Sequence, residues 1–317
     1  MKFFRYFFIF LFSFIYINAK EVKPIFVLET RDLVYDFVLD GSNLFVSNAM
    51  GTIEVFDLFK QKKIDEIVLP PMYNIHGEQV TSKILSVDRY NGKTLFVSTT
   101  LKGFRDVWLH DGMNLKHIIK TENKLAVKEA RFIDDERFIL GTIAHEMILY
   151  NMSDSYKTYR KHIEQSTFSD VVLSEDRKTM ITSSESGRVT LTDVKSGEVI
   201  KIFESQNVDN IYRIDYKNGN IITAGQDRRV GVYAKNSDPY YIKSDFLVYT
   251  ASLSPSGKIG VYSSGEENTL QVFNVKSKEK THELIGHYST PTTIKFIREN
   301  ELFSSGDENK VFYWKIN

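Results

Sequence analysis

The chain contains no cysteine among its 317 residues. This absence excludes disulfide bonds, thiolate-bound metal sites, c-type haem attachment and a lipid anchor on an N-terminal cysteine. A domain of about 300 residues buries roughly three quarters of the surface of its unfolded chain and needs no covalent cross-link. The lack of disulfides is therefore compatible with a large single domain.

Local motifs of the common catalytic and metal sites are absent as well. There is no G-x-S-x-G nucleophile elbow and no phosphate-binding glycine loop, and the seven histidines form no H-x-x-x-H or H-E-x-x-H pair. We therefore predict no catalytic residue, no cofactor and no metal ligand.

An excess of charge of one sign is also missing. The chain has 41 basic and 41 acidic residues, or 39 and 41 when Lys2 and Arg5 are left out. Neither a nucleic-acid footprint nor a polybasic membrane patch is visible, so we expect no nucleic-acid partner.

The N-terminus resembles a secretory signal. Lys2 and Arg5 precede the apolar run from Tyr6 to Ile17, and Ala19 supplies a small residue for cleavage. We predict a signal peptide over residues 1–19, removed in a bacterial periplasm, with residues 20–317 forming one domain without stable membrane insertion. The run is short for a membrane-spanning helix, although an uncleaved anchor remains an alternative.

Seven copies of a three-strand pattern run along the rest of the chain. Each ends on an anchor residue, and consecutive anchors are 53, 41, 42, 41, 40 and 41 residues apart. The anchors are Phe56, Leu109, Tyr150, Thr192, Tyr233, Phe273 and Trp314. A period near 40 with about four strands in each unit predicts an all-β, seven-bladed β-propeller.

A second landmark supports this register. In six copies an apolar residue that opens the preceding strand stands 12 positions before the anchor, and in the second copy Leu95 stands 14 before Leu109. The six residues are Leu44, Phe138, Met180, Ile221, Val261 and Leu302. Turn sequences such as Asp40-Gly41 and Asn91-Gly92 fall between the first and second strands, where positive φ angles are needed.

The seventh copy supplies only three strands, over residues 292–297, 301–305 and 310–316. An open sheet edge would favour aggregation. We predict that the extended segment Pro24–Thr30 forms the outer strand of this last blade and closes the ring.

The last copy carries a family resemblance. Gly286-His287, a serine at position 304 or 305, and Trp314 resemble a WD40 repeat, in which these residues and an Asp form a buried hydrogen-bonded set. Glu308 stands here at the place of that Asp, and we expect it to weaken the set. Asp227 occupies the equivalent place in the fifth copy.

A narrower resemblance is to the propeller accessory proteins encoded with the periplasmic nitrate reductase of epsilonproteobacteria. It rests on the secreted, cysteine-free, seven-bladed pattern, and it implies a role in maturation or assembly without redox chemistry. Haem and iron–sulfur chemistry would then belong to a partner.

One face of the expected ring collects candidate binding residues. An insertion over residues 70–79 accounts for the first, longer interval and contains Tyr73 and His76. Hairpins expected on the same face add Arg105, His145, Arg188 and Arg229. We predict a partner-binding face there; a packed surface loop and a solvated polar rim are the alternatives.

These observations favour a monomeric, non-catalytic periplasmic propeller that binds a protein, such as a subunit of a respiratory oxidoreductase. Two alternatives stay open. One is a metal-dependent hydrolase with ligands at the centre of the ring, and the other is an envelope scaffold in outer-membrane or cell-wall assembly.

Overall fold

The computed structural model describes residues 19–153 and 156–317. The predicted signal peptide, apart from Ala19, lies outside the described residues. Within them, no helix has the length and apolar character needed to cross a bilayer.

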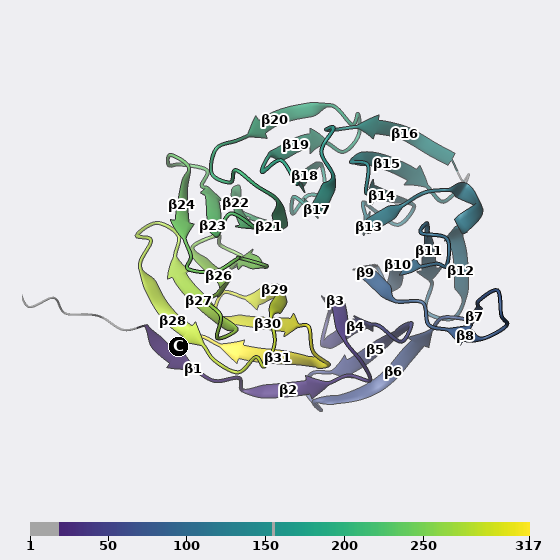
Figure 1. Cartoon of the computed structure of the whole chain (residues 1–317), viewed down its shortest axis with the longest axis horizontal. Helices are drawn as coiled ribbons and strands as arrows, with labels where there is room; N and C mark the ends of the chain where they lie inside the picture. The colour runs from purple at the N-terminus through teal and green to yellow at the C-terminus, as the bar shows by residue number, and fades with distance from the viewer. Residues whose placement is uncertain (1–18, 154–155) are drawn as a thin grey trace, which may run out of the picture.

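Antiparallel sheets form seven blades around a central axis, as the repeat period predicts (Figure 1). The first blade consists of β3 (Val34–Asp40), β4 (Asn43–Asn48), β5 (Thr52–Asp57) and β6 (Lys62–Val68). The second consists of β9 (Ile84–Tyr90), β10 (Lys93–Thr99), β11 (Arg105–His110) and β12 (Leu115–Ile119). The third consists of β13 (Val127–Phe132), β14 (Arg137–Thr142), β15 (Glu146–Asn151) and β16 (Tyr156–His162).

The remaining blades follow the same order from inner to outer strand. The fourth consists of β17 (Phe168–Leu173), β18 (Thr179–Ser184), β19 (Val189–Asp193) and β20 (Val199–Phe203). The fifth consists of β21 (Ile211–Lys217), β22 (Asn220–Gly225), β23 (Arg229–Tyr233) and β24 (Tyr240–Lys243). The sixth contains β25 (Ala251–Leu253), β26 (Ile259–Ser264), β27 (Thr269–Asn274) and β28 (Lys280–Leu284), and the seventh contains β29 (Pro291–Arg298), β30 (Glu301–Gly306) and β31 (Lys310–Lys315).

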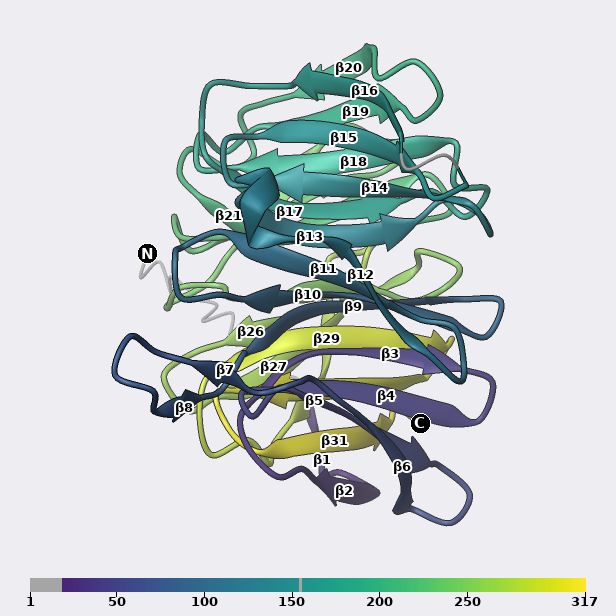
Figure 2. The same cartoon turned by 90° about the vertical axis from the view of Figure 1, so that its right-hand side faces the viewer.

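The ring has two faces, which differ in the loops that they carry. The entry face carries the connections between blades and the hairpins between second and third strands. The exit face carries the hairpins between first and second strands and between third and fourth strands. The insertion after β6 forms a short hairpin, β7 (Met72–Tyr73) and β8 (Gln79–Val80), which projects on the entry face (Figure 2).

In most blades the anchor residue of the repeat pairs across the sheet with the apolar residue that opens the preceding strand. Leu44 faces Phe56 across the first blade, and Leu302 faces Trp314 across the seventh. The sixth blade departs from the predicted register, because Gly260 and not Val261 faces Phe273. A Cβ at Gly260 would lie 2.3 Å from the Phe273 ring, so only glycine leaves room for the ring at this position.

The predicted closure of the ring is confirmed. Strand β2 (Phe26–Glu29) pairs antiparallel with β31 as the outer strand of the seventh blade. Leu28 is buried in the core between this blade and the first, and the Phe26 ring stacks on Tyr313 with centroids 4.7 Å apart. The two ends of the repeat array are thus held by one sheet.

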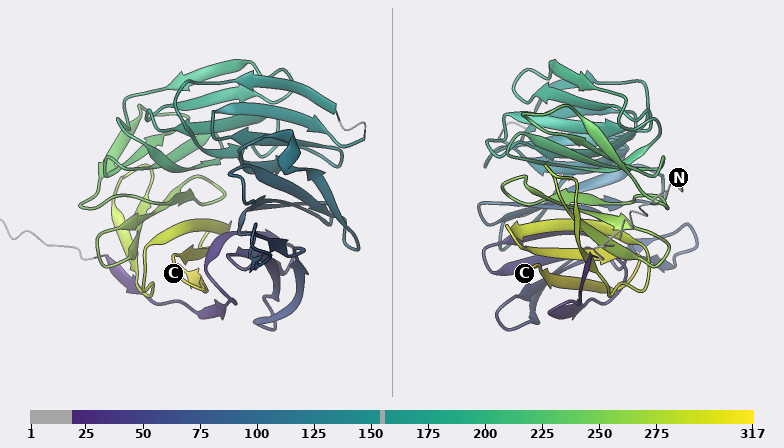
Figure 3. Two further views of the ribbon diagram at one scale, coloured as in Figure 1. Left: turned by 45° about the vertical axis from the view of Figure 1, so that its right-hand side comes forward. Right: turned by 90° about the vertical axis from the view of Figure 1, so that its left-hand side faces the viewer.

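A further strand, β1 (Lys20–Val22), was not predicted. It pairs in parallel with β28 and so covers the outer edge of the sixth blade, on the outside of the ring (Figures 1 and 3). The Ile285 amide donates to the Val22 carbonyl oxygen at 2.9 Å and continues this pairing. The N-terminal segment therefore contributes to two neighbouring blades.

The hydrogen-bonded set of the seventh blade is complete, which corrects the expected weakening by Glu308. His287 Nδ1 lies 2.6 Å from Glu308 Oε1, and His287 Nε2 lies 2.7 Å from Ser304 Oγ. Trp314 Nε1 donates to the same Ser304 Oγ at 2.7 Å. The longer glutamate side chain reaches the ring that an aspartate reaches in the WD40 pattern.

The fifth blade builds a related set without histidine. Asp227 Oδ1 accepts a hydrogen bond from Asn207 Nδ2 at 3.1 Å, and Asn207 Oδ1 accepts one from Thr223 Oγ1. Asp227 also accepts the amides of Val208 and Arg229. An asparagine thus takes the bridging place between the acid and the hydroxyl.

Removing the buried side chain of β2 tests the closure. We expect Leu28→Ala to lower the free energy of unfolding by about 2–4 kcal/mol, because a leucine buried between two blades leaves a cavity. Val27→Ala is the matched control on the same strand, since Val27 is 38% exposed, and it should cost less than about 1 kcal/mol. Chemical denaturation of both variants checks this, and equal losses would contradict the closure.

Candidate functional site: the central channel and the entry face

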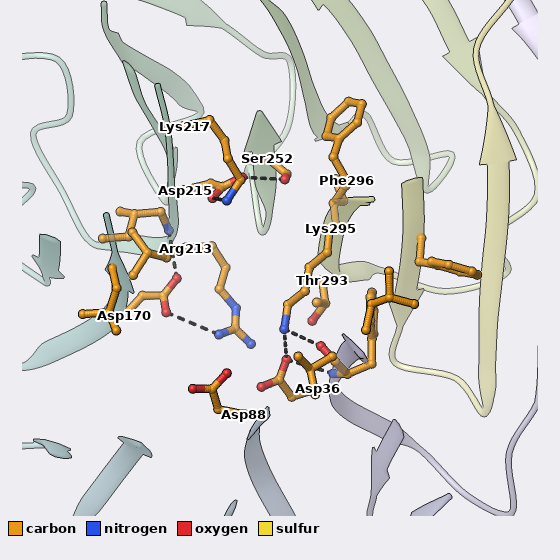
Figure 4. A pocket seen from close by; sticks show the side chains of 18 of the residues that line it. Asp36, Asp88, Asp170, Arg213, Asp215, Lys217, Ser252, Thr293, Lys295 and Phe296 are labelled. Carbon is orange, nitrogen blue, oxygen red and sulfur yellow. Dashed lines mark hydrogen bonds and ion pairs between the residues drawn. The ribbon is translucent and has the colours of Figure 1, made fainter. Parts of the chain in front are cut away.

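A cavity of about 490 Å³ lies at the centre of the ring (Figure 4). Residues of all seven inner strands line it, from β3, β9, β13, β17, β21, β25 and β29. The turn Ser174–Arg177 also lines it, and this turn joins the first two strands of the fourth blade. The cavity therefore reaches toward the exit face.

Charged side chains project into the channel from these inner strands. Alternate residues of a strand point to the same side, so each inner strand directs every second side chain toward the axis. The acidic side chains of the inner strands that line it are Asp36, Asp88, Asp170 and Asp215, and the basic ones are Arg131, Arg213, Lys217 and Lys295. Glu129 is buried beside Arg131 and Arg213.

Four of the aspartates, which we call the latch carboxylates, bind the backbone of the next blade. Each accepts an N–H from the inner strand that follows its own. The pairs are Asp36 with Val87 (3.1 Å), Asp88 with Phe132 (2.8 Å), Asp170 with Ile214 (2.9 Å) and Asp215 with Leu253 (2.9 Å). In Asp36, Asp170 and Asp215 the other carboxylate oxygen accepts the amide of the residue that follows the aspartate.

The inner strand of a blade is a sheet edge, because it pairs with a neighbour on one side only. Its free N–H groups need acceptors when they are buried. The latch carboxylates supply such acceptors at four junctions between blades. They are therefore structural parts of the ring as well as charges of the channel.

Basic side chains serve other junctions. Lys128 Nζ lies 3.4 Å from the Phe168 carbonyl oxygen, which joins the third blade to the fourth. Lys295 Nζ donates to the Phe37 carbonyl oxygen and lies 2.6 Å from Asp36 Oδ1, which joins the seventh blade to the first. In both contacts a lysine donates to a backbone carbonyl oxygen of the next blade, whereas each latch carboxylate accepts a backbone N–H.

Glu129 has a perturbed pKa. Its carboxylate is buried between Arg131, at 2.7 Å, and Arg213, at 3.2 Å. Burial and the neighbouring Asp170 raise the pKa of Glu129 to about 7, against the lowering effect of the two arginines. Burial likewise raises the pKa of Asp88.

Asp36 shows the opposite balance. Burial acts to raise its pKa, but Lys295, Arg131 and Arg213 outweigh that effect and hold the pKa below its usual value. Asp36 is thus ionised near neutral pH while Glu129 titrates there. Near neutral pH the channel region therefore contains one carboxylate of constant charge, Asp36, and one that gains or loses a proton, Glu129.

Two predicted binding residues, Tyr73 and His76, lie in the exposed β7–β8 hairpin. Its tip is ordered by Asn74, whose Oδ1 accepts the amides of His76 and Glu78 at 2.9 and 3.0 Å. A shallow hollow of about 290 Å³ separates Tyr73 from Leu101 and Lys102 of the second blade. The hairpin and this hollow form one continuous surface.

The predicted arginines do not converge. Arg105 donates to nearby carbonyl oxygens of its own loop, and Arg188 pairs with Glu204 at 2.7 Å. Arg229 lies over the Tyr241 ring, 4.3 Å from its centroid. These three side chains belong to different blades and are engaged within their own blades.

The assignment of His145 to the binding surface is wrong, because its side chain is fully buried. Nε2 lies 3.1 Å from Thr182 Oγ1 of the next blade, and the Phe168 ring packs edge-on against the imidazole. Burial lowers the pKa of His145 to about 4, so the imidazole is neutral at physiological pH. His145 is a packing residue between the third and fourth blades.

Sequence analysis did not identify the channel residues as a group. The sequence signal that could have identified them is a charged residue at alternate positions of an otherwise apolar strand. No group of three or more His, Cys, Asp or Glu side chains in the described ranges could hold a metal ion. The acidic and basic side chains that line the channel make it a mixed ionic site.

The comparisons with known proteins agree with this architecture. No family model matches the chain, and no curated protein matches it. Among solved structures, the β-propeller domain of Cps50 (Swd1) from Myceliophteria thermophila is similar, with a TM-score of 0.73 over 93% of this chain and 99% of that chain. The chain is a seven-bladed β-propeller. At 13% sequence identity the likeness concerns the fold alone.

The raised pKa of Glu129 predicts a pH-dependent stability. Its ordinary value is 4.5 and its folded value is about 7, so the folded state binds more protons than the unfolded state between these pH values. The contribution of Glu129 to the free energy of unfolding therefore falls as the pH rises through that window, by on the order of 1–3 kcal/mol.

Glu129→Gln should remove this decline, so its stability relative to the unmodified chain should increase from pH 5 to pH 8. Glu266→Gln, the same change at an exposed glutamate, is the control and should leave the profile unchanged. Denaturation curves across this pH range check the prediction. Parallel profiles for Glu129→Gln and the unmodified chain would contradict it.

Proposed function

We propose that this chain is a non-catalytic periplasmic protein that binds a protein partner through the entry face of its ring. The observation that carries the proposal is the uneven distribution of exposed apolar side chains between the loops of the two faces. Among the described residues, the entry face exposes Leu33, Met50, Tyr73, Ile75, Leu101, Ile143, Val208 and Tyr288. Among the described loops, those of the exit face expose only Phe59 and Met113. The other exposed apolar side chains lie along the outer rim of the ring, among them Val199, Ile200 and Ile202 of β20.

Apolar side chains gathered on one face of a soluble protein are typical of an interaction surface. Aromatic and methionine side chains at such a face are also enriched in protein interfaces. The β7–β8 hairpin adds Tyr73 and Ile75 to this face, and Ile75 is 94% exposed at its tip. Asn74 Oδ1 accepts the amides of His76 and Glu78, so the backbone that carries these two side chains is preorganised for binding.

The nature of the partner follows from the predicted export signal and from the resemblance to nitrate reductase accessory proteins. A periplasmic oxidoreductase subunit is the partner that fits both, and the propeller would assist its assembly or maturation. The proposal places residues 20–317 in the periplasm as a monomer after removal of residues 1–19. An envelope scaffold would use the same face with a different partner.

The experiment compares paired changes on the two faces. Tyr73→Ser with Ile75→Ser removes two large side chains from the entry face, and Phe59→Ser with Met113→Ser removes two from the exit face. Phe59 and Met113 are 88% and 87% exposed, so the control changes a comparable apolar surface without touching the core. Both variants should fold as the unmodified chain does.

Affinity-tagged chains expressed in the native host should recover the catalytic subunit of the periplasmic nitrate reductase. We expect at least a tenfold loss of recovery for the entry-face variant, equivalent to about 1.4 kcal/mol, and none for the exit-face variant. Recovery that is equal for both variants would refute the face assignment. Recovery of outer-membrane assembly factors in place of the reductase would favour the scaffold.

A further inference from the structure

The charges that line the central cavity differ in how far they are accessible. Five acidic and five basic side chains line it: Asp36, Asp88, Asp170, Glu175 and Asp215, and Arg131, Arg177, Arg213, Lys217 and Lys295. The formal charge of the lining is therefore balanced. Its accessible charge depends on which of these side chains face the open volume.

The four latch carboxylates have side-chain exposures between 4% and 14%. Four basic side chains, Arg177, Arg213, Lys217 and Lys295, are more open, with exposures between 28% and 37%. The carboxylates lie back against the ring wall because they bind backbone amides of the next blade. The cavity therefore exposes more positive than negative side-chain surface, although equal numbers of acidic and basic residues line it.

Hydrogen-bonding capacity shows the same asymmetry. Asp36 accepts the amides of Phe37 and Val87 and a bond from Lys295 Nζ. Asp215 accepts the amides of Tyr216 and Leu253 and the Ser252 hydroxyl at 2.7 Å. A cation that entered the cavity would have to compete with these donors for the same oxygens.

The basic side chains retain donors. A guanidinium has five N–H groups and an ammonium has three. Among the described residues, Arg213 makes one hydrogen bond, from Nη1 to Glu129 Oε1, and the same nitrogen lies 3.7 Å from Asp170 Oδ1. Lys217 Nζ approaches Asp215 Oδ1 at 3.5 Å, and both cations point toward the central volume (Figure 4).

We propose that the central cavity binds a small multivalent oxyanion, such as inorganic phosphate or a polycarboxylate, through Arg213, Lys217 and Lys295. These three side chains come from two blades on different sides of the cavity. They supply charge-assisted donors, and the arginine supplies a planar fork that matches a carboxylate or phosphate. A volume of about 490 Å³ suits a small ligand and excludes a folded partner.

Glu175 is an exposed acidic side chain of the cavity lining. Its Oε1 accepts the Asn218 amide at 2.6 Å, so this carboxylate is engaged at the junction of the fourth and fifth blades. The inference does not depend on the proposed protein partner, because the cavity reaches toward the exit face and the partner surface lies on the entry face.

Isothermal titration of the purified chain with sodium phosphate and with sodium citrate, at constant ionic strength set by sodium chloride, tests the proposal. We expect saturable binding of one equivalent of at least one of these anions. Tighter binding of phosphate would identify a phosphate-type ligand, and tighter binding of citrate a polycarboxylate. No saturable binding of either anion would overturn the proposal.

Two matched variants locate the site. Lys217→Gln should weaken binding about tenfold or more, because it removes one charge-assisted contact. Lys178→Gln makes the same change at a lysine of the exit face that is 81% exposed and does not line the cavity, and it should leave binding unchanged. Equal effects of the two changes would mean that the anion responds to net surface charge only, which would overturn the site.

Arg213→Lys provides a second test that keeps the positive charge beside Glu129. We expect it to weaken binding at least fivefold, since a lysine cannot reproduce the planar fork. Unchanged affinity in this variant, together with unchanged affinity in Lys217→Gln, would exclude the cavity as the binding site.

Discussion

The constraint on which the molecule depends is the need to satisfy the inner edges of its blades. Each inner strand pairs with one neighbour and turns its other side toward the channel and the adjoining blade. Backbone N–H groups on that side are costly when they are buried without acceptors. Aspartates of the preceding blade provide the acceptors at four junctions, so the charge of the channel and the integrity of the ring have a common cause.

The outer edges of the sixth and seventh blades are covered by a different device. The N-terminal segment supplies β2 to the seventh blade and β1 to the sixth, where it covers an edge that would otherwise be open. Covering edges in this way suppresses association between sheets. The apolar side chains exposed on the entry face belong to loops and to the β7–β8 hairpin, apart from the outer strands of the blades.

The repeat could be predicted from the sequence because its determinants are local. Anchor residues, glycine turns and spacing lie within about 15 residues of one another, and they placed β2 against the last blade correctly. The sixth blade shows the limit of this reasoning. Val261 fits the spacing, but the Phe273 ring needs the free space above Gly260, and that contact is visible only in three dimensions.

The channel could not be predicted in the same way because its charged residues do not occupy one position of the repeat. Asp88 itself faces the opening residue of its second strand, Leu95, whereas Asp36 stands three residues before the corresponding partner, Leu39. Only three of the seven copies, with Asp36, Glu129 and Asp170, carry an acid at the position three residues before that partner, so an alignment of the copies has no consistently acidic column. The prediction that His145 is a surface residue was wrong for a related reason. A histidine in a hairpin is expected to be exposed, but the next blade covers this one.

Native-state hydrogen exchange, resolved by residue, tests the role of the latch carboxylates most directly. The amides of Val87, Phe132, Ile214 and Leu253 lie on sheet edges and would exchange quickly if no acceptor held them. If the carboxylates bind them as described, these amides should exchange as slowly as ladder amides of the central strands β4 and β22. Exchange as fast as that of exposed loop amides would contradict the account.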